Sequence, residues 1–257
     1  MAEPALQPDT PRHVLTAVEF DVLWERLGLG PTPVVLRLDS PGRTHTERRD
    51  LQESGWQALR SRGLAGPTGP DPELARLLHL LARPTGQLEL RGLWKRRVRA
   101  VSAGAAGTCV LAVRQDATVT LEAHGSLPAA LLRALPHSAP GPGRASTVPS
   151  ALLTSATAAA SATGLRAPLL GADVPPTEAG LLARMLSGIT AGAQIVALVA
   201  DRWGVLRRSG GVLAILDAPR GRYLLTRSTG EDGVEWTTIA PTDARRLAHR
   251  MSELLAP

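Results

Sequence analysis

The chain has 257 residues, of which 44% are apolar and 3% aromatic, and its net charge is +6. This length and apolar content suit one large domain or two small halves, with a core of Leu, Ala and Val. A single cysteine excludes an internal disulfide, the N-terminus lacks a secretory signal pattern, and the apolar runs are too short to span a membrane. We therefore expect a soluble cytoplasmic protein.

The first part of the chain predicts mainly helices. Residues 1–12 carry three prolines and predict a flexible N-terminal segment. Thr16 begins a helix, because Thr16 and Glu19 match a capping box. Asp71 followed by Pro72 begins another, since Asp is a favoured N-cap and Pro a favoured first helical residue. Between these two helices we expect a strand over 34–38 and a helix over 46–62.

A long β region follows. Alternating or continuous apolar runs predict four strands, over 87–94, 98–103, 108–114 and 118–123. A short helix is expected over 127–135. Residues 136–149 are rich in Pro, Gly and Ser, a composition typical of a linker.

The second part begins with helices over 150–161 and 179–187, separated by a loop over 169–176. Strands over 194–200 and 204–208 then lead to a meander, because short polar turns join three apolar runs. The meander strands are expected over 211–217, 222–227 and 234–239. Thr242 is the expected N-cap of a terminal helix that reaches Leu255, with apolar residues at helical spacing.

The two parts contain a weak internal repeat. An apolar helix followed by Gly86, Gln87 and Leu88 resembles a second helix followed by Ala193, Gln194 and Ile195. The runs 110–113 and 212–215 also match at nearly the same offset. Either the matches are coincidences among Leu- and Ala-rich segments, or the halves 13–135 and 150–257 share one build and are joined by 136–149.

No set of residues forms a pattern typical of catalysis or metal binding. The chain has neither a nucleophile elbow nor a phosphate-binding loop, and its six histidines lie far apart in sequence. Cys109 stands in an apolar strand, which favours a buried and inert thiol. We therefore expect no catalytic residue, no metal and no cofactor.

A dense basic cluster surrounds Trp94 at the turn between two predicted strands. Three interpretations stay open: a protein-binding loop that meets acidic partner residues, a nucleic-acid contact, or an edge hairpin kept soluble by its charge. Arg202 beside Trp203 repeats this combination in the second half.

The chain resembles the EspG family of chaperones associated with ESX (type VII) secretion. The resemblance rests on the order of many short matches from the first helix to the last. These include Leu15-Thr16, Glu19-Phe20, Leu23-Trp24, Pro33-Val34-Val35-Leu36, Asp71-Pro72-Glu73-Leu74, Leu80-Leu81-Ala82-Arg83-Pro84, Gly141-Pro142-Gly143, Gly221-Arg222-Tyr223 and Ala240-Pro241.

The resemblance implies an α+β fold with a central, mostly antiparallel sheet flanked by two helical bundles, in quasi-twofold halves. It implies a single domain over 13–257 and a cytosolic, non-enzymatic chaperone that binds and solubilises PE–PPE-type clients before export. The partner is then a helical secretion substrate, with no nucleic acid or membrane, and the chaperone is a monomer or homodimer. The alternatives are a nucleic-acid-binding module, or an enzyme with a cleft between the halves.

By resemblance, the client contacts are a loop between early strands and a C-terminal helical bundle. The loop corresponds to residues 91–97, and the bundle to 150–161, 179–187 and 242–255. The expected contact residues are Arg91, Leu93, Trp94, Lys95, Arg96, Arg97, Arg184, Arg245, His249 and Arg250.

Overall fold

A computed structural model of the chain describes residues 12–36, 38, 42, 44–105, 107–159 and 164–256. The chain divides into two compact units. Unit 1 comprises Met1–Glu89, Val98–Ala134 and Ala200–Leu206; unit 2 comprises Leu90–Arg97, Leu135–Val199 and Arg207–Pro257. None of the described helices is long and apolar enough to cross a membrane.

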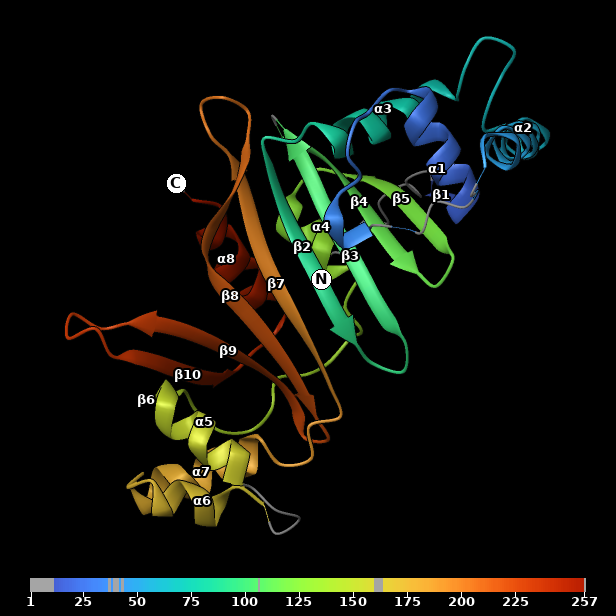
Figure 1. Cartoon of the computed structure of the whole chain (residues 1–257). Helices are drawn as coiled ribbons and strands as arrows, with labels where there is room; N and C mark the ends of the chain where they lie inside the picture. The colour runs from blue at the N-terminus through green and yellow to red at the C-terminus, as the bar shows by residue number, and fades with distance from the viewer. Residues whose placement is uncertain are drawn as a thin grey trace, which may run out of the picture. The chain divides into compact units, whose positions relative to one another are not determined.

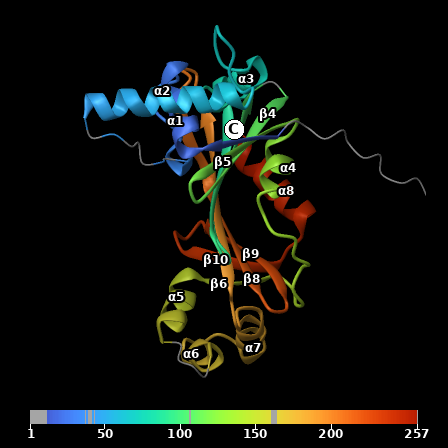
Figure 2. The ribbon, with the colours of Figure 1, turned by 90° about the vertical axis from the view of Figure 1, so that its right-hand side faces the viewer.

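Unit 1 combines an antiparallel sheet with helices. Its strands are ordered β1-β5-β4-β3-β2. The pairs β1–β5, β5–β4 and β4–β3 are antiparallel. Figures 1 and 2 show α1, α2 and α3 grouped beside β4 and β5. The elements are β1 (Arg12–Thr16), α1 (Ala17–Arg26), the 3-10 helix η1 (Val34–Leu36), α2 (His45–Ser61), α3 (Pro72–Ala82), β2 (Gly86–Leu93), β3 (Arg97–Ala105), β4 (Thr108–Gln115), β5 (Thr118–His124) and α4 (Leu127–Leu132).

Helix caps start the three helices of this group. Thr16 and Thr44 each accept from the backbone N–H three residues on, and Glu19 and Glu47 return the bond, so both caps are capping boxes. Asp71 accepts from Leu74 N at 2.9 Å, with Pro72 as the first helical residue. The apolar face of α3 (Leu74, Leu77, Leu78 and Leu81) packs into a core with residues of α1, β3, β4 and β5.

Glu19 does more than cap α1, because its buried carboxylate also accepts from Arg62 Nη1 at 2.7 Å. Burial acts to raise the pKa of Glu19, but the bonds from Arg62 and Thr16 outweigh it and hold the pKa below its ordinary value. A depressed pKa stabilises the fold above the unfolded-state pKa, and this stabilisation is lost as the pH falls through the folded-state value.

Glu19→Gln is therefore expected to lower the free energy of unfolding by about 1 kcal/mol at pH 7, a value reduced for the partial exposure of Arg62. Urea unfolding of the variant and the wild type should show this difference shrinking as the pH falls below about 4. Glu53→Gln removes the same charge from an exposed position of α2 and serves as the control. An equal difference at pH 7 and pH 3 would contradict the assignment.

The strands of unit 2 are ordered β7-β8-β9-β10-β6, and the pairs β8–β9, β9–β10 and β10–β6 are antiparallel. Figures 1 and 2 show α5, α6 and α7 grouped together, and α8 lying apart from them. The elements are β6 (Ser146–Pro149), α5 (Ser150–Ala159), α6 (Arg166–Gly171), α7 (Pro176–Met185), β7 (Ala191–Ala200), β8 (Leu206–Ala218), β9 (Gly221–Thr229), β10 (Glu235–Pro241) and α8 (Ala244–Leu255).

The two faces of the β9–β10 pair lie against different helices. Tyr223 and Ile239 point into a core shared with α5, α6 and α7. Leu224 lies opposite Ala240 in the register, and both line a groove with α8. This alternation follows from the two-residue period of a strand.

The two units share one order of elements, which confirms the internal repeat. Each has a first strand, a group of helices, a four-stranded meander and a last helix, and in each the first strand pairs with the fourth strand of the meander. The match of 110–113 with 212–215 is wrong, however, because these runs lie in the third strand of one meander (β4) and the second of the other (β8). The predicted α+β class, with a mostly antiparallel sheet and two helical groups, is confirmed.

Several local expectations are wrong. The strand expected over 34–38 does not begin at Val34: Leu36 N donates to Pro33 O at 2.9 Å, closing a 3-10 turn whose Val35 and Leu36 are buried, and residue 37 lies outside the described residues. Residues 169–176 are not all loop, since α6 extends to Gly171. Arg12 is the first residue of β1 and not part of a flexible segment, and residues 1–11 lie outside the described residues.

Two boundaries also shift. The N-cap of α8 is Asp243, which accepts from Arg246 N at 2.8 Å, and not Thr242. The strands expected over 204–208 and 211–217 are one continuous strand, β8.

The segment 136–149 is fixed along β9 and β10 for much of its length. Ala139 O accepts from Arg222 N at 2.8 Å, Gly141 N donates to Arg222 O at 3.1 Å, and the last four residues form β6. Tyr223 Oη donates to Pro142 O at 3.1 Å. The segment 136–149 is therefore paired within unit 2, although its composition is rich in Pro and Gly. The single domain over 13–257 stays a prediction.

Candidate functional site

The basic cluster forms the tip of the β2–β3 hairpin. Leu93 ends β2, Trp94 N donates to Arg96 O at 3.1 Å across the turn, and Arg97 begins β3. Leu93 is 56% exposed. The other exposed residues of the tip are Arg91, Lys95, Arg96 and Arg97. We call residues 91–97 the basic hairpin; it combines one exposed apolar side chain with four cationic ones.

Trp94 differs from the other residues of the basic hairpin, because its indole is turned inward. Its Nε1–H donates to Asp217 Oδ2 at 2.8 Å, and the residue is only partly exposed. Trp94 is one of the expected contact residues, and that expectation stays a prediction. The structure adds that Trp94 is hydrogen-bonded to β8.

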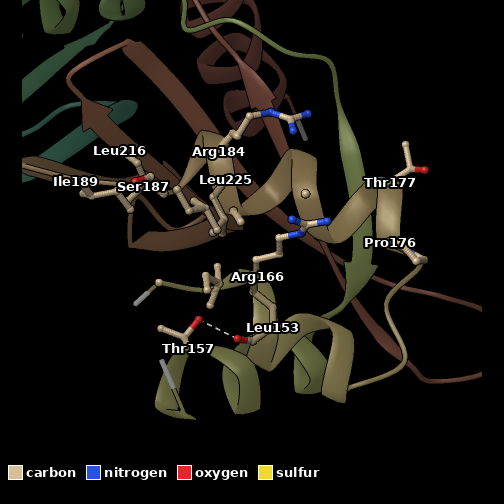
Figure 3. A pocket seen from close by; sticks show the side chains of 16 residues that line it. Leu153, Thr157, Arg166, Pro176, Thr177, Arg184, Ser187, Ile189, Leu216 and Leu225 are labelled. Carbon is tan, nitrogen blue, oxygen red and sulfur yellow. Dashed lines mark hydrogen bonds between the residues drawn. The ribbon is translucent and has the colours of Figure 1, made fainter. Parts of the chain in front are cut away.

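A cavity of about 910 Å³, which we call the bundle groove, lies among α5, α6, α7 and the sheet of unit 2. Figure 3 shows its apolar lining, with side chains contributed by α5, β8 and β9 together with residues that follow α7. Its large aliphatic lining residues are Leu153, Leu165, Leu186, Ile189, Leu216 and Leu225. Ile189 is 43% exposed, so the apolar lining continues to the surface.

Two arginines accompany this apolar lining, Arg166 on α6 and Arg184 on α7 (Figure 3). The sequence identified Arg184, although only because it lies off the apolar stripe of its helix. It missed Arg166, because no helix was expected over 166–171. An apolar cavity bordered by cations suits a partner that presents apolar side chains next to carboxylates.

The three residues predicted on the terminal helix line a different cavity. Arg245, His249 and Arg250 face a groove of about 480 Å³ between α8 and the β9–β10 pair, together with Arg246, which the sequence did not identify. His249 and Arg250 both contact Glu253, and Arg246 donates to Pro241 O at 3.1 Å. Because α8 lies apart from α5–α7, the expectation that it belongs to the same bundle is wrong.

Charge is distributed unevenly between the units. Unit 2 holds 15 Lys and Arg and 8 Asp and Glu, a net charge of +7, whereas unit 1 holds 14 and 15, a net charge of −1. The basic hairpin, the bundle groove and the α8 groove all belong to unit 2. The excess positive charge of the chain is thus carried by the unit that contains every predicted contact residue.

The remaining candidate groups are Cys109 and the side chains that could bind a metal ion. Cys109 is buried, as expected, and burial raises the pKa of its thiol to about 11, which disfavours the reactive thiolate. Within the described ranges, no three side chains of His, Cys, Asp or Glu come together in a way that would hold a metal ion.

Comparison with known proteins gives a family and a fold. A sequence profile of the EspG family matches residues 16–253. Among solved structures, this chain is similar to EspG5, the type VII secretion system chaperone of Mycobacterium tuberculosis, in complex with a PE25–PPE41 dimer. The TM-score is 0.72 and the identity 19%, and the match covers 95% of each chain. No curated protein matches the chain.

Proposed function

The chain belongs to the EspG family, and from this membership we propose that it is a cytoplasmic chaperone of a type VII secretion system. In this proposal it binds PE–PPE-type clients and keeps them soluble before export. The family match over residues 16–253 carries the proposal. The EspG5 structure supports it, because a protein of the same fold is bound there to a PE25–PPE41 dimer.

The mechanism we propose is masking of an aggregation-prone surface. Large exposed apolar patches on a soluble protein favour association, so covering them keeps a client in solution. The basic hairpin would supply Leu93 as an apolar contact and Lys95 and Arg97 as charges, while the bundle groove would accept apolar side chains beside Arg166 and Arg184. This action is reversible, involves no chemical step and needs no cofactor.

We keep Arg91, Arg96, Arg245, His249 and Arg250 in the proposed contact set. Trp94 takes another role in it, since its indole donates to Asp217 Oδ2. The net charge of +7 on unit 2 favours a client that carries acidic groups around its apolar surface, because complementary charge accelerates association and selects between partners.

Co-expression tests the proposal. The chain is produced together with PE–PPE gene pairs from its own genome, one pair at a time, with an affinity tag on the client. We expect one pair or more to become soluble and to elute with this chain as a single species in size-exclusion chromatography. Each pair expressed without the chaperone is the control. Pairs that stay insoluble, or that elute separately from the chain in every case, would rule out this function.

A further inference from the structure

The inward orientation of Trp94 belongs to a larger network. Its indole N–H donates to Asp217 Oδ2, and its ring lies over Gly92: a Cβ added to Gly92 would stand 2.2 Å from Trp94 Cζ3. Glycine at position 92 is therefore required by the approach of this ring. The added atom would also meet Ala193 of β7 at 3.1 Å, so the tip is packed closely on the sheet of unit 2.

Asp217, the acceptor for Trp94, is itself held by Arg222. The two residues are directly opposite each other in the β8–β9 register. Arg222 Nε donates to Oδ1 at 2.7 Å and Nη2 to Oδ2 at 2.8 Å, which is the forked geometry of a strong pair. Their side chains are 5% and 13% exposed for Arg222 and Asp217 respectively, so solvent screens the pair only weakly.

The network reaches a third segment, because Arg222 Nη2 also donates to Pro136 O at 3.0 Å. Burial acts to raise the pKa of Asp217, yet the hydrogen bonds from Arg222 and Trp94 outweigh it and hold the pKa below its ordinary value. The carboxylate is therefore ionised at neutral pH, with both of its oxygens occupied by donors in fixed directions.

We propose that Asp217 and Arg222 are positioning residues of the basic hairpin: they fix the indole of Trp94 and so hold the tip in one conformation before a partner arrives. This inference rests on the proposed function only where it concerns the benefit for client binding. That benefit arises because a loop that is ordered before binding loses less conformational entropy when it binds. The order of the tip itself is a property of the free chain, and it can be measured without a client.

Lys95 makes this measurement simple, because it is the only lysine in the chain and lies at the centre of the tip. Endoproteinase Lys-C cuts after lysine and would give two fragments, 1–95 and 96–257. The native tip should be cut slowly. In Trp94→Phe, which keeps an aromatic ring but lacks the N–H donor, cleavage should be about tenfold faster, the expected result of losing one hydrogen bond to a charged acceptor.

Asp217→Asn provides the second variant, since it keeps the shape of the side chain and removes its charge. We expect its cleavage rate to rise as well. Trp203→Phe, at an exposed tryptophan in the turn between β7 and β8, is the matched control and should be cut at the wild-type rate. Faster cleavage in both variants, at a rate nearly independent of low urea, would support local release of the tip. Wild-type rates in both variants would overturn the proposal.

Binding to a client separates this inference from the proposed function. If a PE–PPE pair binds the wild-type chain, Trp94→Phe and Asp217→Asn should bind it more weakly, through a lower association rate. Trp94→Phe should do so with little change in melting temperature, whereas Asp217→Asn should also lower the melting temperature, because it leaves the buried Arg222 without its charged partner. Equal association rates in variants whose tip is cut faster would show that the order of the tip does not serve binding. If no pair binds the wild type, the proposed function fails, while the proteolysis result still decides whether the network orders the tip.

Discussion

Replacing Leu93 by Asp and Lys95 by Glu is expected to weaken client binding by more than about 30-fold while leaving the melting temperature unchanged. Leu93 is more than half exposed and Lys95 is exposed, so neither substitution disturbs the core. The double substitution places negative charge where we propose that an apolar and acidic client surface lies. Truncation of an interface hot-spot residue costs about 2 kcal/mol or more, and new like charges add repulsion. Titration of the purified variant with a co-purified client measures the effect.

The matched control lies at the turn between β7 and β8, which corresponds to the β2–β3 turn in the shared order of elements. Val205→Asp with Arg202→Glu makes the same change in charge at an exposed apolar residue and an exposed basic one. We expect this control to bind the client normally. If both pairs of substitutions weaken binding equally, the effect comes from overall charge, and the basic hairpin has no special role.

Gly141→Ala is expected to destabilise the protein by about 3 kcal/mol, a large part of the stability of an ordinary domain. A Cβ at this position would stand 2.2 Å from Tyr223 Cζ, far inside van der Waals contact. The ring of Tyr223 is fully buried, and its hydroxyl donates to Pro142 O, so it cannot move aside cheaply. The segment 139–142 would have to leave β9. Urea denaturation at neutral pH, read by circular dichroism, measures the loss.

Gly171→Ala is the appropriate control for this substitution. Gly171 also belongs to unit 2, its φ is not positive, and an added Cβ would meet nothing within 4 Å. We expect its stability to be unchanged or slightly higher, as is usual for Gly→Ala within a helix. Full stability of Gly141→Ala would mean that 136–149 is a loose linker after all.

The sequence predicts an element well when the residues that stabilise it lie close together along the chain. The capping box at Thr16 and the N-cap Asp71 followed by Pro72 involve residues three positions apart or fewer, and both start helices in the structure. The four strands between 87 and 123 are right because short apolar runs bounded by turn residues indicate buried strands. The family, too, could be recognised from the order of such short matches.

Strands that exist only through distant pairing were missed. β1 and β6 have five and four residues, too few to show a period, and each is ordered by pairing with the last strand of a meander. The helix α6 has six residues and no side-chain cap, so it carries no start signal. In each case the stabilising contact comes from another part of the chain.

The sequence by itself determined the family, the α+β class, the positions of the main helices and strands, and the cluster of basic residues around Trp94. Only the tertiary structure decided what that cluster presents. It turns Trp94 toward a carboxylate 123 residues away, leaves Leu93 exposed, and separates Arg184 from the α8 groove. The physical reason is that a side chain's direction depends on partners brought together by the sheet, and the spacing of residues along the chain does not record them.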